Sequence, residues 1–160
     1  MECHNDKYIV IMTEDDLYQI VWLSRPMMQA AEGRVERDLA GSGLTVRTRA
    51  VLEILAREGA VTVPDLARHL QIQRQYVQVM VNETLAQDLT EKQPNPRHQR
   101  SPLIALTAAG RAMVEPILKQ ELAFMADIAQ ELDPHEVKAA LKISRLLIER
   151  LSETAGQGGA

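Results

Sequence analysis

The spacing of hydrophobic residues predicts that most of this chain is helical. Apolar residues recur every three or four positions within residues 17–39, 46–55 and 113–151, which is the period of one helix face. Gly41-Ser42-Gly43 closes the first of these segments, because glycine readily adopts the left-handed turn that follows a helix. We therefore expect long N- and C-terminal helices around a middle section of different character.

Capping residues predict where the outer helices begin. Thr13-Glu14-Asp15-Asp16 places a cap before three acids, so we expect the first helix to start there, after a flexible lead-in over residues 1–13. This helix contains Pro26, where we expect a kink. Asp133-Pro134-His135-Glu136 predicts the start of the last helix, and the glycine-rich residues 154–160 should form a disordered tail.

The middle section alternates short helices and strands. A helix that begins after Thr45 stops at Gly59, and Val61-Thr62-Val63 is short and β-branched, as in a small strand. Thr62-Val63-Pro64-Asp65 resembles a capping box and predicts a third helix. A break at residues 71–73 leads into a fourth helix over 74–87.

A two-stranded hairpin follows the fourth helix. Residues 89–93 and 103–106 predict its strands, and the intervening loop starts at Pro94 and is basic. The predicted fold class is therefore mostly α with a small β-wing. We expect residues 45–106 to form a winged helix-turn-helix lobe, an architecture typical of DNA binding. We expect residues 14–44 and 107–153 to form long flanking helices with enough apolar surface for dimerisation.

The charge is distributed unevenly along the chain. The formal net charge is −4, which by itself argues against nucleic acid. Residues 66–111, however, contain six Lys and Arg against three Asp and Glu. A basic segment on an acidic body confines a DNA-binding face to one side of a protein.

The fourth predicted helix has the chemistry of a DNA-reading element. In a helix-turn-helix the second helix lies in the major groove, so it needs one buried apolar side and one polar side. Arginine pairs with guanine, and glutamine or asparagine pairs with adenine. An ordinary amphipathic helix with a solvated face would show the same division. The candidate DNA-contacting residues of this helix are Gln73, Arg74, Gln75, Gln78, Val79 and Asn82.

The basic loop after this helix is a second candidate site. Arg97 and Arg100 are three residues apart, with His98 between them and no acid from Lys92 to Arg111. Guanidinium groups at the tip of a wing reach phosphates or the minor groove beside the recognition helix. A solubilising turn would explain the charge but not its position directly after the helix-turn-helix.

The basic loop and the segment after it read Asn95-Pro96-Arg97-His98-Gln99-Arg100-Ser101-Pro102-Leu103-Ile104-Ala105-Leu106-Thr107-Ala108-Ala109-Gly110. This stretch resembles the wing pattern of the MarR (multiple antibiotic resistance regulator) family. That pattern has two arginines three apart, an apolar strand and Leu-Thr-x-x-Gly, and the resemblance covers roughly residues 14–152. It implies a homodimeric regulator, more often a repressor, that binds a pseudo-palindromic operator on double-stranded DNA. It also implies release by a small aromatic or lipophilic effector.

Three positions depart from the family pattern. Asn95 and His98 stand where the family commonly has Asp, so an acid that would brace a wing arginine is missing at His98. Val79 falls where the recognition helix often carries Arg. Asp88 replaces the glycine expected after that helix. These departures predict a divergent member with altered operator preference.

The family's effector crevice, between the dimer arms and the DNA-binding lobe, has candidate lining residues in this chain. They are Tyr18, Trp22, Met27, Met28 and Phe124, although aromatic and methionine residues at helical spacing also belong to ordinary cores. A peroxide sensor would need a reactive thiol, and Cys3 has only Lys7 and His4 nearby as basic residues. The chain has no metal-ligand spacing, no cofactor motif and no catalytic pattern, so we expect a non-enzyme without cofactor or metal.

Two alternatives remain open beside a DNA-binding regulator. A winged-helix protein-interaction module without DNA binding would fit Val79 and the net acidity, and a peroxide-responsive regulator would use Cys3. No apolar run approaches the roughly 20 residues that cross a bilayer, and a single cysteine cannot form an intrachain disulfide. We therefore expect no membrane association and a cytoplasmic location.

Overall fold

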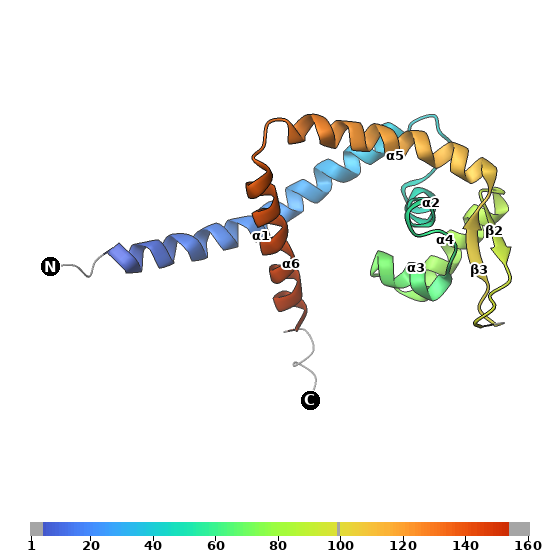
Figure 1. Ribbon diagram of the computed structural model, residues 1–160, viewed down its shortest axis with the longest axis horizontal. Helices are drawn as coiled ribbons and strands as arrows, with labels where there is room; N and C mark the ends of the chain where they lie inside the picture. Colours follow the sequence, from blue (N-terminus) through green and yellow to red (C-terminus); the bar gives the residue numbers. More distant parts are fainter. Residues whose placement is uncertain (1–4, 99, 154–160) are drawn as a thin grey trace. The chain divides into compact units, whose positions relative to one another are not determined.

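The computed structural model describes residues 5–98 and 100–153, with side chains from residue 14 onward. This part of the chain contains six helices and one small sheet, arranged along the chain as drawn in Figure 1. In chain order the elements are α1 Asn5–Leu39, α2 Val46–Glu58, β1 Val61–Thr62, α3 Val63–Leu70, α4 Arg74–Ala86, β2 Thr90–Gln93, β3 Leu103–Leu106, α5 Ala108–Ala129 and α6 Pro134–Glu153. This order confirms the predicted fold class.

The chain divides into two compact units. The first is Met1–Ile117 and the second is Leu118–Ala160. The boundary falls inside α5, so this one helix belongs to both units. The first unit contains the hydrophobic core, and the second consists of the rest of α5 together with α6.

The start of α1 differs from the sequence prediction. The helix begins at Asn5 rather than after Thr13, so Thr13 lies within it. No glycine or proline interrupts residues 5–13, so nothing in this segment prevents the helix from beginning before Thr13. The helix also continues through Pro26 to Leu39. Cys3, His4 and the predicted tail 154–160 lie outside the described residues.

The predicted capping residues set the boundaries of α2 and α3. Thr45 caps α2 through a reciprocal pair of bonds with Thr48, and Gly59 ends it at a φ of 79°. Thr62 and Asp65 form the expected capping box at α3, with Pro64 in the first turn. The Thr62 hydroxyl donates to Asp65 Oδ2 at 2.6 Å. The backbone bonds of the two capping boxes satisfy N–H groups in the first turns that have no partner within the helix.

The core lies where α2, α3 and α4 meet the sheet. β3 is the central strand and pairs antiparallel with β2 on one side and β1 on the other. The predicted hairpin is therefore extended to three strands, because Val61 and Thr62 pair with Ile104 and Leu103. The buried cluster consists of Val51, Leu55, Val63, Leu66, Val77, Met80, Val81 and Ile104.

A tight junction joins the end of α4 to the start of α5. Asp88 takes a φ of 55°, and Leu89 N–H donates to the Thr84 carbonyl at 3.0 Å, as in a Schellman ending. The Thr107 hydroxyl donates to the Asp88 carbonyl at 2.7 Å and accepts from the Gly110 N–H at 3.0 Å. A Cβ at Gly110 would overlap the Leu89 carbonyl group. This junction explains why the chain has Leu-Thr-x-x-Gly here.

The second unit exposes most of its apolar surface. Asp133 caps α6 by accepting the His135 N–H at 2.8 Å, as predicted. None of the residues of α6 is buried, and the exposed apolar residues include Val137, Leu141, Leu146, Ile148 and Leu151. A surface of this kind on a folded helix is typical of one that another chain covers.

Candidate nucleic-acid interface

Helices α3 and α4 form the predicted helix-turn-helix. The turn between them consists of residues 71–73, and Gln71 takes the left-handed conformation at a φ of 54°. Ile72 N–H then donates to the Ala67 carbonyl at 3.3 Å. This three-residue turn ends α3 and redirects the chain into α4, which begins at Arg74 as predicted.

Helix α4 has one buried side and one exposed side. Val77, Met80, Val81 and Thr84 are buried against the core. Of the predicted DNA-contacting residues, Gln73, Arg74, Gln75, Val79 and Asn82 are exposed and Gln78 is half-buried. The structure therefore gathers all six at the start of α4 and on its outer side. Their contact with DNA stays a prediction.

Two polar side chains on this outer side are bonded to each other. Gln78 Nε2 donates to Asn82 Oδ1 at 3.0 Å, one turn apart on the helix. Gln73, the residue that precedes α4, makes no side-chain capping bond. The side-chain amides of this surface therefore point outward, and the Gln73 amide does not cap the helix.

Tyr76 is an exposed residue that sequence reasoning did not include. It is 64% exposed in the first turn of α4, beside Gln75 and three residues before Val79. Its position could have been found from the spacing of the buried residues 77, 80, 81 and 84, because that set leaves residue 76 outside the buried stripe. Its phenol adds an aromatic face and a hydroxyl to the surface of α4.

Glu83, the carboxylate of α4, lies beside a guanidinium group from α2. Arg47 Nη2 is 3.5 Å from Glu83 Oε1. Both side chains are partly solvated, so the pair contributes little to stability. Its electrostatic effect is to offset the negative charge that Glu83 would otherwise place next to the polar side of α4.

The wing loop is held by Asn95 rather than by a carboxylate. Asn95 is buried, and its Nδ2 donates to the Ser101 carbonyl at 2.8 Å. Its Oδ1 accepts the N–H groups of Arg97 and His98 at 3.0 and 3.3 Å. An ionised carboxylate could accept the two N–H groups but could not donate to the Ser101 carbonyl, whereas the Asn95 amide does both. Asn95 therefore closes the base of the loop from within.

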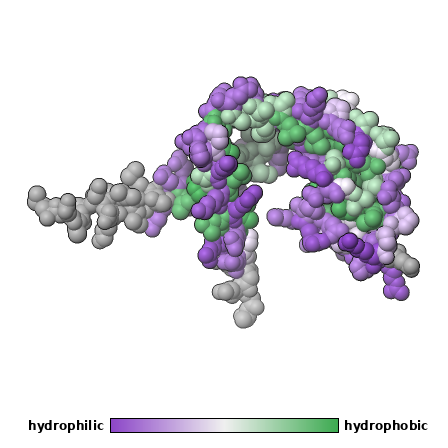
Figure 2. Space-filling view, in the orientation of Figure 1, coloured by the Kyte–Doolittle hydropathy of each residue, from purple (hydrophilic) through white to green (hydrophobic). Residues whose placement is uncertain are grey.

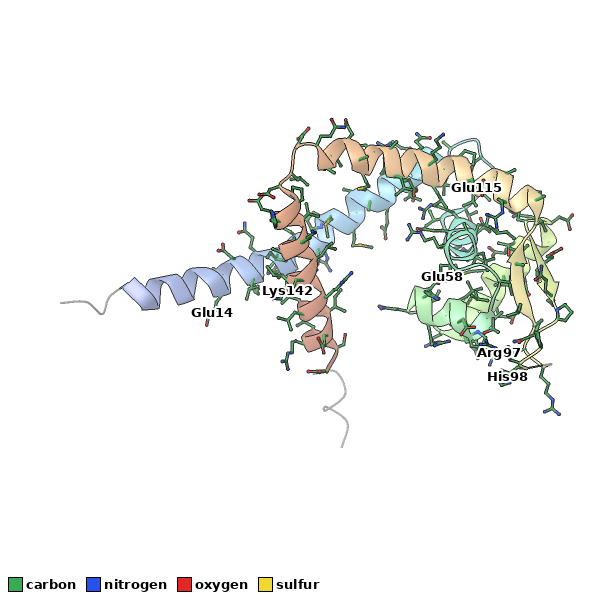
Figure 3. All side chains as sticks on the ribbon, in the orientation of Figure 1. Glu14, Glu58, Arg97, His98, Glu115 and Lys142 are labelled. Carbon is green, nitrogen blue, oxygen red and sulfur yellow. The ribbon has the colours of Figure 1, made fainter. Side chains whose placement is uncertain are left out.

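The three predicted wing residues lie at the tip of this loop. Figure 3 shows Arg97 and His98 at the end of the hairpin, and Arg97, His98 and Arg100 are all exposed. Within the described part of the chain, neither Arg97 nor Arg100 forms an ion pair. Gln99 lies outside the described residues. Both guanidinium groups are presented to solvent.

The wing is fixed to α4 by a buried polar contact. The hydroxyls of Thr84 in α4 and Thr90 in β2 are 2.8 Å apart, and the Thr84 hydroxyl also contacts the Val81 carbonyl at 2.9 Å. Both threonines are almost fully buried. Breaking a satisfied buried pair costs more than breaking an exposed one, so the wing and the helix hold a defined relation.

The candidate effector residues are dispersed over two helices. Tyr18 and Trp22 pack edge to face on α1, with ring centroids 6.1 Å apart, and remain more than half exposed. Met27 and Met28 are also exposed on α1, whereas Phe124 is half-buried on α5 in the second unit. In Figure 2 hydrophobic surface is visible on the helices outside the DNA-binding lobe. The predicted effector site stays a prediction.

Metal-binding clusters and membrane spans are two other classes of site. No group of three or more His, Cys, Asp or Glu within residues 5–98 and 100–153 is placed to hold a metal ion. Among the described helices, none is both long and apolar enough to span a membrane.

Comparisons with known proteins place this geometry in a family. Residues 42–101 match the model of the MarR family. A MarR family transcription regulator of known crystal structure is 31% identical, with a TM-score of 0.81 over 94% of this chain and 99% of its own. A MarR family regulator from Neisseria meningitidis is 19% identical, with a TM-score of 0.76 over 90% of this chain and 99% of its own, and supports the fold.

Two further relatives complete the comparison. An uncharacterized protein from Mycobacterium tuberculosis is 36% identical over 92 residues, which are 58% of this chain. This chain spans 62% of the length of that curated relative. The regulator BpsR from Bordetella bronchiseptica, whose DNA binding is regulated by 6-hydroxynicotinic acid, is 25% identical with a TM-score of 0.66, over 81% of this chain and 98% of its own.

The winged helix-turn-helix, the wing pattern and the full-length similarity agree with one another. The expectation of a non-enzyme is consistent with them, because the matching family consists of transcription regulators. The chain belongs to the MarR family of winged helix-turn-helix transcriptional regulators.

Proposed function

We propose that this protein is a homodimeric repressor that binds a pseudo-palindromic operator and is released by a small effector. The α4 helix of each subunit enters the major groove, and Arg97 and Arg100 contact the neighbouring DNA backbone or minor groove. Binding to the operator then blocks transcription. A repressor of this kind acts where the chromosome lies, so we propose a cytoplasmic location.

The observation that carries DNA binding is the pairing of α4 with the wing. The outer side of α4 is polar and its carboxylate is offset by Arg47, while the wing presents two exposed guanidinium groups. The Thr84–Thr90 contact joins the two elements. Such a surface favours a polyanion with readable base edges over an uncharged partner.

The observation that supports a dimer is the uncovered apolar surface of the outer helices. Leu141, Ile148 and Leu151 of α6 are each at least 50% exposed. Burying such side chains against a second copy gains roughly 25 cal/mol per Å². A symmetric dimer also doubles the contacts that one half-site supplies.

The support for an effector comes from a relative and from exposed apolar side chains. DNA binding of BpsR is regulated by 6-hydroxynicotinic acid, a small aromatic acid. Tyr18, Trp22 and the methionines of α1 supply an aromatic and adaptable surface. An effector releases DNA only if it binds the DNA-free arrangement more tightly.

DNA affinity measured at several salt concentrations tests the proposal. The probe is a double-stranded fragment that the full-length protein has selected from a random-sequence pool, and the readout is fluorescence anisotropy. We expect log Kd to rise linearly with log salt, with a slope near 0.9 for each phosphate neutralised. Replacing Arg97 and Arg100 by Ala should lower the slope by about one for each phosphate that the variant no longer neutralises.

A matched control separates the wing from general charge. Arg57→Ala with Arg111→Ala removes two exposed arginines that already pair with Glu53 and Glu115 on their own helices. This double variant should keep the wild-type slope. If the wing variant also keeps it, the wing assignment is wrong. If no fragment is selected at low salt, the fold serves as a protein-interaction module instead.

A further inference from the structure

The outer side of α4 is polar except at Val79, which lies in the middle of it. Val79 is 51% exposed there, one residue after Gln78 and three before Asn82. A valine side chain neither donates nor accepts a hydrogen bond. Whatever base pair it covers loses hydration at that point without a replacement partner.

The four bases respond differently to such a side chain. In the major groove guanine presents two acceptors, cytosine a donor, and adenine one of each, all of which are left unpaired against valine. Thymine alone presents a methyl group beside its acceptor. An isopropyl group on the reading face therefore favours thymine by contact and disfavours guanine by desolvation.

The neighbouring amides favour the partner base. Gln78 Nε2 donates one of its two hydrogens to Asn82 Oδ1, a bond that orients both amides and presents the Gln78 carbonyl as an acceptor and the Asn82 amide nitrogen as a donor. Within the described residues neither side chain makes another hydrogen bond. One acceptor beside one donor matches the N6 and N7 groups of adenine, whereas guanine would leave the carbonyl facing an acceptor.

We propose that Val79 is a specificity-determining residue that reads a thymine methyl group, beside an adenine read by the joined amides of Gln78 and Asn82. This inference rests on the proposed DNA-binding function and names the sequence that function requires. The half-site would thus contain adjacent T and A at its centre of contact with α4, and Arg74, in the first turn, is the residue of α4 suited to guanine.

Removing the thymine methyl group tests the inference directly. Each thymine of the selected fragment is replaced in turn by uracil, which pairs with adenine in the same way but lacks the methyl group. With the wild-type protein we expect uracil at one position in each half-site to weaken binding about fourfold, the value of burying one methyl group. In the Val79→Ala variant the same replacement of thymine by uracil should weaken binding by less than about twofold.

Two controls keep the result specific. Ile72→Ala removes another exposed apolar side chain, 41% exposed, in the turn before α4. This variant should show the full fourfold uracil effect. Val79→Arg introduces a side chain that pairs with guanine, and a fresh selection with this variant should return guanine where the wild type returns thymine.

The outcomes distinguish this inference from the function on which it rests. Tight, salt-dependent binding to a selected site without thymine, or equal uracil effects in wild type and Val79→Ala, overturns the role of Val79 and leaves DNA binding intact. Failure to select any fragment overturns both. The uracil series on the wild-type protein needs no variant, so it remains decisive if a substitution impairs folding.

Discussion

Replacing Asn95 by alanine tests how the wing is held together. The change removes one donor and one acceptor, and with them three bonds of 2.8, 3.0 and 3.3 Å to the backbone of residues 101, 97 and 98. Each such bond contributes about 1 kcal/mol net. Because water can replace part of this stabilisation at an exposed loop, we expect the closed loop to be destabilised by about 2 kcal/mol.

The effect should be local, so amide hydrogen exchange is the suitable assay. The N–H groups of Arg97 and His98 are shielded only while Asn95 Oδ1 accepts them. A decrease of about 1.4 kcal/mol in opening free energy speeds exchange tenfold, and we expect at least that at both positions. The amide of Val81, in the buried part of α4, should exchange at the wild-type rate.

Asn95→Asp is the informative companion variant. A carboxylate keeps both acceptor bonds but cannot donate to the Ser101 carbonyl. Exchange at Arg97 and His98 should therefore be slower than in Asn95→Ala, while the Ser101 end of the loop opens. Unchanged exchange in Asn95→Ala, or equal rates in the two variants, would refute the idea that this amide braces the wing.

Three other changes probe the lobe. Gly110→Ala should destabilise it by about 3 kcal/mol in thermal or urea unfolding, because the new Cβ would overlap the Leu89 carbonyl group. Gly33→Ala is the control: its Cβ meets only an arginine side chain at 3.6 Å, so stability should be unchanged or higher. Asp88→Gly should raise the free energy of unfolding by about 0.5–1 kcal/mol by relieving a φ of 55°, and an unchanged midpoint would contradict the strain. The Thr62 hydroxyl bond, with help from Arg68, lowers the pKa of Asp65. The contribution of the Asp65 carboxylate to stability is therefore complete above the pKa of this group in the unfolded chain. It is lost as the pH falls through the lower pKa of the folded protein. The midpoint difference between wild type and Asp65→Ala should shrink in acid, and a constant difference down to about pH 2 would count against this role.

Local chemistry made much of the fold predictable from the sequence. The caps at Thr45, Thr62 and Asp133 and the stop at Gly59 act within a few residues of themselves, so the sequence carries the whole signal. The two faces of α4 follow from helical spacing in the same way. The strand at Val61 was also visible, but its pairing with Ile104 joins residues 43 positions apart, and no local pattern specifies that contact.

Other features depended on contacts that a linear pattern does not contain. Thr13 looks like a cap, yet helix propagation from Asn5 passes through it. Asn95 appeared as a departure from a family pattern, whereas its amide makes three loop bonds. Tyr76 carries neither a charge nor an amide, so the chemistry expected of base reading did not point to it. The residues for an effector stay a prediction, because they lie on the outer helices α1 and α5 and no local sequence pattern says what surrounds them.

The junction of Asp88, Thr107 and Gly110 has a mechanical consequence. It clamps the first turn of α5 to the end of the recognition helix and the base of the wing. The same α5 is 22 residues long, about 33 Å, and the boundary between the two units falls just after its Pro116. Because α4, the wing and the first turn of α5 are joined through this junction rather than through a flexible linker, a change in the direction of the first turn of α5 moves α4 and the wing with it.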